Sequence, residues 1–135
     1  MKRLPTTLLA LALALSPMAR AAGPGPIACN LRVFTRADRV RHLELSAMLK
    51  EKVSEMREVP GGYAFRYAPE LLQKLAEWTA LETRCCPFIG FQLELEPQPG
   101  GSAWLRLLGN EDVNEFIRTD FQPLIKLAQA KQQLK

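Results

Sequence analysis

The sequence predicts an α+β fold in which an antiparallel-rich sheet has its helices packed on one face. Apolar and polar residues alternate over 63–68, 88–96 and 103–108, which is typical of half-buried strands. Apolar residues recur at intervals of three and four between 45 and 56, as on one side of a helix. A second apolar helix follows over 69–85. The expected order is strand, helix, strand, helix, strand, strand, helix, and a ferredoxin-like topology is the first choice.

The first 21 residues have the pattern of a secretory signal peptide. Lys2 and Arg3 provide a positive start, residues 8–15 are an unbroken run of Leu and Ala, and Ala19-Arg20-Ala21 is a small-residue cleavage site. The apolar run is about half of the ~20 residues that a membrane-spanning helix needs, which favours cleavage after Ala21 over a retained anchor. We therefore expect a periplasmic or secreted protein with no stable membrane insertion after signal cleavage.

Signal cleavage also removes most of the net positive charge. The whole chain has 18 Lys and Arg against 14 Asp and Glu, and the signal segment contains Lys2, Arg3 and Arg20 but no acidic residue. The mature chain is therefore close to neutral, with 15 basic residues against 14 acidic ones. No stripe of interleaved aromatic and basic residues replaces the lost charge, so nucleic acid is not an expected partner.

The mature chain has the length of one domain with a single hydrophobic core. We expect a loose leader at 22–30, a single α+β domain at 31–130 and a polar tail at 131–135 that frays. An exported bacterial-type protein enters an oxidising compartment, in which disulfides are permitted. Since the chain has three cysteines, at least one thiol is left over or pairs outside the chain.

The first part of the domain predicts an extended segment followed by a long helix. Residues 27–35 favour a short strand. Thr35 is a suitable cap for a helix expected over 37–58, with Met56 in its apolar stripe. The turn Pro60-Gly61-Gly62 then separates this helix from the first alternating strand.

The second part predicts a helix, a hairpin and two shorter helices. Pro69 suits a helix start, and Pro87 both ends that helix near Cys85 or Cys86 and disfavours helical geometry at Cys86. The strands over 88–96 and 103–108 form the hairpin. Caps are expected at Asn110 for one helix and at Asp120 for the last. The predicted core contains Leu75, Trp78, Phe91, Leu93, Leu105 and Phe116.

The most concentrated reactive groups are the adjacent thiols of Cys85 and Cys86, between a helix and a strand. Neighbouring Cα atoms lie ~3.8 Å apart, whereas a relaxed disulfide needs ~4.4–6.8 Å, so a bridge between these two would be strained. Cys29 is the natural third partner. It can bridge to either neighbour, or all three thiols can converge on one soft ion, for which Hg, As, Cu and Zn are the candidates. A third alternative is that the adjacent thiols are buried and inert.

The helix polarity bears on the chemistry of these thiols. They lie at the predicted carboxyl end, where the helix dipole disfavours thiolate, and only Arg84 is adjacent to oppose it. Together with the absence of a C-x-x-C motif, this argues against a thioredoxin-type nucleophile. A bound cation would deprotonate the thiols itself, so metal binding is compatible with this position.

Two further residues are weak candidates for metal ligands. His42 is the only histidine and is expected on the surface or at a helix flank. Glu82 lies four residues before Cys86 and is expected to be exposed. No phosphate loop, G-x-S-x-G or H-E-x-x-H motif is present, so a thiol-dependent enzyme is the third hypothesis, after a metal-binding module and a structural or interaction domain with a Cys29 disulfide.

The motif Glu82-x-x-Cys85-Cys86-Pro87-Phe88-x-x-Phe91-x-Leu93, with Trp104-Leu105-x-Leu107-x-Gly109 and Glu115-Phe116-Ile117, resembles a family of small bacterial proteins. The family has no assigned activity, and some members are associated with heavy-metal resistance. The resemblance covers roughly residues 29–118 and implies a shared fold and a thiol-metal role. Adjacent cysteines also occur in mercury-handling proteins, a looser likeness. Where the family often has Gly-Pro, this chain has Gly109-Asn110.

Overall fold

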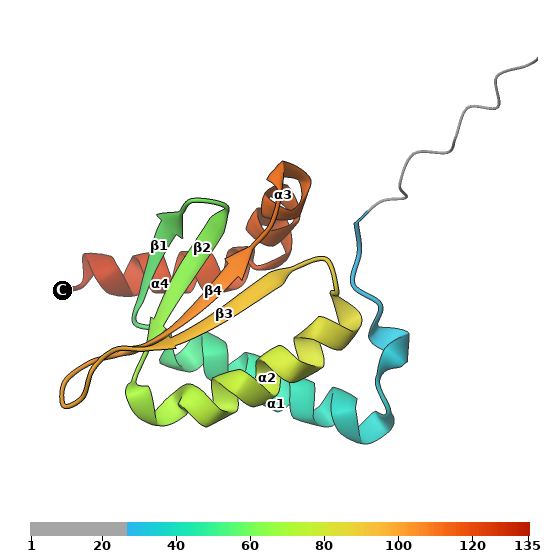
Figure 1. Ribbon diagram of the computed structural model, residues 1–135, viewed down its shortest axis with the longest axis horizontal. Coiled ribbons are helices and arrows are strands. Elements are labelled where there is room, and N and C mark those ends of the chain that lie inside the picture. Colours follow the sequence, from blue (N-terminus) through green and yellow to red (C-terminus); the bar gives the residue numbers. More distant parts are fainter. Residues whose placement is uncertain (1–26) are drawn as a thin grey trace, which may run out of the picture.

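A computed structural model describes residues 27–135 and shows the expected α+β fold (Figure 1). The predicted signal peptide and most of the predicted leader lie outside the described residues. Among residues 27–135, no helix is both long and apolar enough to cross a membrane. The elements are η1 (Leu31–Val33), α1 (Arg36–Lys52), β1 (Glu55–Val59), β2 (Gly62–Tyr67), η2 (Pro69–Leu71), α2 (Leu72–Cys85), β3 (Gly90–Leu95), β4 (Ala103–Leu108), α3 (Glu111–Asp120) and α4 (Gln122–Gln133).

The four strands form one antiparallel sheet in the order β1-β2-β4-β3. Leu105 at its centre pairs with Phe65 of β2 on one side and with Leu93 of β3 on the other. The predicted hairpin of β3 and β4 is present. The chain order of the domain is helix, two strands, helix, two strands, two helices, which differs from the predicted order at its start. The expected ferredoxin-like order is not confirmed.

The prediction of a helix over 37–58 was wrong in its last part. Helix α1 ends at Lys52, and Glu55–Val59 is strand β1, which pairs with β2 through the turn at Gly61. Met56 fits the three-and-four spacing of the helix, yet it lies opposite Phe65 in the sheet. Gly62 of β2 also allows β2 and β4 to lie close together, because a Cβ at this position would lie 2.0 Å from the carbonyl oxygen of Leu107.

The predicted strand at 27–35 is also absent. Residues 31–33 form the short 3₁₀ helix η1, capped by Asn30, whose side chain accepts a hydrogen bond from the backbone of Arg32. The backbone N–H of Asn30 donates to the carbonyl oxygen of Cys85 over 2.8 Å, so this segment is bonded to the end of α2 and not to a sheet edge. Thr35 caps α1 as expected, in a reciprocal capping box with Asp38.

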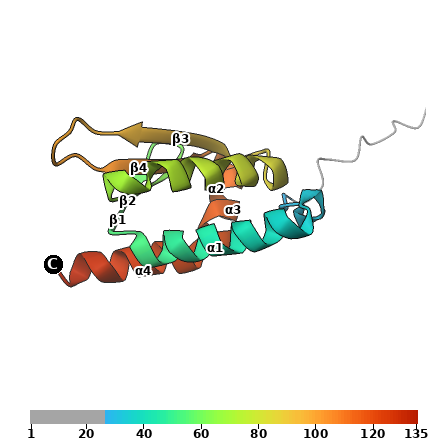
Figure 2. The same cartoon turned by 90° about the horizontal axis from the view of Figure 1, so that it is seen from below.

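The hydrophobic core lies between one face of the sheet and the helices. Figure 2 shows α1 and α4 on the same side of the sheet, with α2 packed against α1 and the β3 edge. Of the predicted core residues, three are buried: Leu75, Trp78 and Leu105. The other three are partly buried and pack against the core: Phe91, Leu93 and Phe116. The prediction is therefore confirmed for α2 and for Leu105, whereas Phe91, Leu93 and Phe116 pack against the core without being fully buried.

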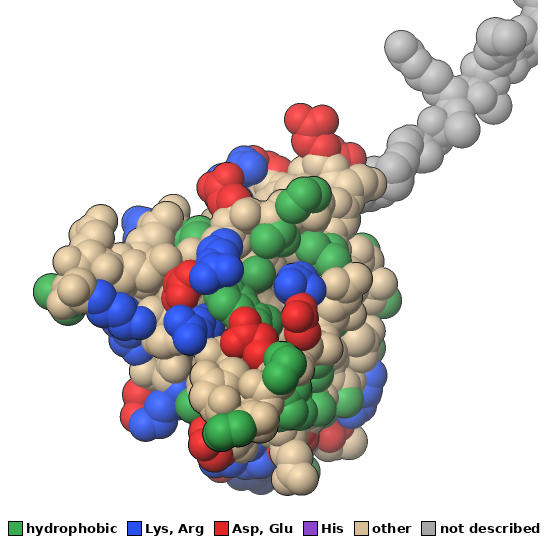
Figure 3. Space-filling model, turned by 60° about the vertical axis from the view of Figure 1, so that its left-hand side comes forward, with side chains coloured by type: hydrophobic (Ala, Val, Ile, Leu, Met, Phe, Trp, Pro, Cys, Tyr) green, Lys and Arg blue, Asp and Glu red, His purple; other side chains and the backbone are tan. Residues whose placement is uncertain are grey.

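The opposite face of the sheet carries polar side chains and one buried aromatic residue. Trp104 is buried there because the Arg57 guanidinium lies 4.5 Å from the centre of its ring, while its indole N–H donates to Glu96. Ion pairs link neighbouring strands, as between Arg66 and Glu55. Figure 3 shows one side of the molecule, where Lys and Arg are interspersed with Asp and Glu.

The last two helices differ from prediction at their junction and at the chain end. Asn110 caps α3 by accepting from the backbone of Val113 over 3.0 Å, as expected. Asp120 is the last residue of α3 and makes no capping bond to α4. The predicted tail begins inside α4, where Lys131 donates to the carbonyl oxygen of Val53 and Gln132 to that of Met56. These bonds oppose fraying because they attach α4 to the β1 region.

Replacing Leu75 with alanine should lower the free energy of unfolding by roughly 2–5 kcal/mol, since its side chain is fully buried and the site cannot close completely around the cavity. Urea denaturation measures this change. The matched control is Leu43→Ala, because Leu43 is 68 % exposed and its truncation should change stability by less than about 0.5 kcal/mol. Equal midpoints for the two variants would contradict the assigned core.

Candidate functional site

The adjacent cysteines lie at the point where α2 ends. Cys85 is the last helical residue, and Cys86 has left helical geometry with φ −123° and ψ 64°, as expected before Pro87. The backbone N–H of Cys86 still donates to the carbonyl oxygen of Glu82 over 2.7 Å, and the N–H of Ile89 donates to Cys86 over 3.2 Å. Backbone bonds on both sides therefore hold the two thiol-bearing residues at a fixed turn.

The structure pairs Cys29 with Cys86 in a disulfide, one of the two pairings that the sequence left open. Their Cα atoms are 4.6 Å apart, within the range that a disulfide spans, although 57 positions separate them in sequence. The bond from Asn30 to Cys85 brings Cys29 beside the end of α2. The thiol of Cys85 is left free and is buried.

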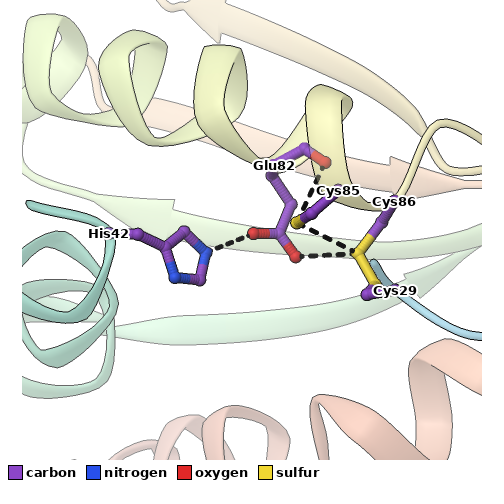
Figure 4. Close-up of a disulfide and its surroundings, with 5 residues drawn as sticks. All are labelled: Cys29, His42, Glu82, Cys85 and Cys86. Carbon is purple, nitrogen blue, oxygen red and sulfur yellow. Dashed lines mark hydrogen bonds and ion pairs between the residues drawn. A yellow bond between two sulfur atoms is a disulfide. The ribbon is translucent and has the colours of Figure 1, made fainter. Parts of the chain in front are cut away.

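The three sulfur atoms converge with one carboxylate (Figure 4). The Sγ atoms of Cys85 and Cys86 lie 3.5 Å apart. One ligand atom from each of Cys29, Glu82, Cys85 and Cys86 lies within 4.8 Å of the other three. Both members of the adjacent pair therefore face the same small volume, and that volume also receives Cys29.

Glu82 is buried, contrary to the expectation that it is exposed. One of its carboxylate oxygens lies 2.5 Å from Nε2 of His42 on α1, and the other lies 3.4 Å from Sγ of Cys86. In the disulfide, Cys86 has no proton to donate, so the second contact becomes a hydrogen bond only on reduction. Glu82 lies four residues after Trp78 and three before Cys85, which are both buried, and this spacing could have indicated the buried side of α2.

His42 is a half-buried residue that reaches the sulfurs only through Glu82. Its ring packs against Phe34 and stacks on Trp78, with centroids 5.1 Å and 6.4 Å away. It does not belong to the group of four converging ligand atoms. The position of His42 therefore favours a role in holding the Glu82 carboxylate over a direct ligand role.

The electrostatics of the site disfavour thiolate. Burial, followed by the negative charge of Glu82, raises the pKa of the Cys85 thiol to about 11. The neighbouring Arg84 opposes this only weakly, because its guanidinium is bonded to Asp38 and to the carbonyl oxygen of Val33. Cys85 is therefore a poor nucleophile at neutral pH, in agreement with its place at a helix carboxyl end.

A cavity of about 180 Å³ lies on the other side of the Glu82 and His42 pair. Trp78 forms part of its wall and donates its indole N–H to Ser46 over 3.0 Å. None of the three cysteines lines this cavity. The cavity and the sulfur site are thus separate spaces that share Glu82 and His42 as a partition.

Of the sequence-predicted site residues, the structure brings together Cys29, Cys85, Cys86 and Glu82, and it places His42 directly behind Glu82. Comparison of the chain with models of known protein families, with characterised proteins and with solved structures finds no match to any of them. The geometry of the site therefore carries the functional argument.

Proposed function

We propose that the exported protein binds one soft, thiophilic ion per chain through Cys29, Cys85 and Cys86. The observation that carries this proposal is the convergence of three sulfurs and one carboxylate oxygen within 4.8 Å of one another. Thiolates select soft or borderline ions, so Hg(II), As(III), Cu(I) and Zn(II) are the candidates, and hard ions such as Mg(II) are expected to bind poorly. The motif resemblance noted in the sequence led to the same expectation of a thiol-metal role.

The Cys29–Cys86 disulfide is, in this proposal, the oxidised form that cannot bind the ion. Two of the three sulfurs are bonded to each other in it, so only the Cys85 thiol is available. An external dithiol would open the bridge by becoming a disulfide itself, which leaves two new thiols on Cys29 and Cys86. Attack at Cys29 is favoured sterically, because Cys29 is half-buried while Cys86 is fully buried.

A structural or interaction domain with the Cys29 disulfide and no ligand is the second candidate. The formed bridge and the complete burial of Cys86 favour it, since a buried disulfide stabilises a small exported domain without any further role. Both candidates are compatible with the oxidised structure. They differ in what the reduced protein does when a soft ion is added.

Native mass spectrometry of the mature protein, oxidised and reduced, separates the two candidates. The reduced protein should retain one Hg(II) or As(III) per chain, and the oxidised protein should bind it at least roughly 100-fold more weakly, because it lacks two of the three thiols. Mg(II) serves as the hard-ion control. Failure of the reduced, folded protein to retain any soft ion would leave the structural role as the better account.

A further inference from the structure

The separation of the adjacent sulfurs restricts the coordination geometry. If an ion lies ~2.3 Å from each sulfur, a typical metal–thiolate length, sulfurs 3.5 Å apart subtend an angle of about 100° at that ion. A linear two-coordinate ion with the same bond lengths would need sulfurs ~4.6 Å apart. This spacing is that of the disulfide form, and because backbone bonds hold Cys85 and Cys86 at a fixed turn, we expect the reduced pair to keep it closely. The adjacent pair thus suits a pyramidal centre and is too close for the linear geometry that two-coordinate Hg(II) prefers.

The charge around the sulfurs restricts the ion further. Three thiolates around Zn(II) or Hg(II) form a complex of charge −1, and around Cu(I) one of charge −2. A buried anion needs a nearby cation. Glu82 instead places a carboxylate oxygen 3.4 Å from Sγ of Cys86, and its partner His42 is already engaged by it. Arg84 is exposed and bonded to Asp38.

From these two constraints we propose that the physiological ligand is trivalent arsenic or an element of the same chemistry, held by all three sulfurs. This inference rests on the proposed function and names its substrate class. Arsenite at neutral pH is the uncharged As(OH)₃, and it reacts with three thiols to give three As–S bonds and three water molecules. No charge is created and no oxidant or reductant is consumed, so the product is neutral and pyramidal.

Glu82 has a discriminating role in this site. Its carboxylate excludes anionic complexes but leaves the neutral arsenic complex almost unaffected. Burial of the Cys85 and Cys86 thiols also favours arsenite over metal cations. As(OH)₃ binds protonated thiols without net loss of protons, whereas a metal cation must displace the thiol protons. Glu82 is therefore a selectivity residue in this proposal and not a ligand.

Competition titrations of the reduced protein with arsenite, Cu(I), Zn(II) and Hg(II) test the proposal, with the Glu82→Gln variant in parallel. In the wild type, arsenite should bind at least roughly 100-fold more tightly than Zn(II). In the variant, affinity for Zn(II) and Cu(I) should rise by about tenfold or more relative to affinity for arsenite. A fall in Zn(II) affinity would mean that Glu82 is a ligand and would overturn its assigned role.

The outcomes separate this inference from the proposed function. Binding of Hg(II) or Zn(II) with no binding of arsenite would overturn the arsenic assignment and leave soft-ion binding intact. No binding of any ion would end both. If the Glu82→Gln variant does not fold, the wild-type order of affinities decides alone. Cys29→Ser adds a further check, because loss of the third sulfur should weaken arsenite binding by roughly 100-fold, and unchanged binding would exclude a three-sulfur site.

Discussion

Replacing both Cys85 and Cys86 with serine should lower the affinity of the reduced protein for arsenite and Hg(II) by at least about 1,000-fold. The two sulfurs are 3.5 Å apart and are fixed by the end of α2, so they supply most of the preorganised part of the site. Serine hydroxyls are hard ligands that do not deprotonate at neutral pH, and they cannot replace soft thiolates. Isothermal titration of the reduced proteins measures the loss.

A suitable control for this double variant is Thr83→Ser, which changes an exposed side chain in the same turn of α2 without touching a sulfur. Its affinity should match the wild type. Equal Hg(II) affinity in the wild type and the double variant would show that the adjacent pair is not the binding site, and the disulfide-only interpretation would then be the better one.

Removing the disulfide should produce the second large effect. Cys29→Ser is expected to lower the free energy of unfolding by roughly 2–4 kcal/mol, because the bridge spans 57 positions and restricts the unfolded chain. The bridge also holds the 27–35 segment against α2, where one backbone bond from Asn30 and one side-chain bond from Arg84 to Val33 remain without it. Chemical denaturation of the oxidised proteins measures the difference.

Reduction provides the internal control for this prediction. A reducing agent should lower the stability of the wild type to about that of the Cys29→Ser variant and should leave the variant unchanged. A difference below about 0.5 kcal/mol between oxidised and reduced wild type would contradict the expected contribution of the bridge. In that case the bridge at Cys29 would attach the 27–35 segment to α2 without adding to the free energy of unfolding.

The sequence by itself determined the features that depend on local signals. Pro87 ends α2 and sets the geometry of Cys86, because a proline excludes helical continuation whatever surrounds it. The alternation in 88–96 and 103–108 predicted the β3–β4 hairpin and the buried side of Leu105. The adjacency of Cys85 and Cys86 is also visible in the sequence alone, and the strain of a bridge between neighbours made Cys29 the natural third partner.

Only the tertiary structure decided the features that depend on partners far along the chain. The position of Met56 fits the apolar stripe of a helix and a strand equally well. Pairing of β1 with β2 decides for the strand, because it gives the backbone N–H and C=O groups of β1 their hydrogen-bond partners. The backbone bond between Asn30 and Cys85 brings Cys29 beside the adjacent cysteines, and only the structure shows that its partner is Cys86. Glu82 is buried because His42 of α1 engages its carboxylate from 40 positions away, a compensation that no local pattern contains.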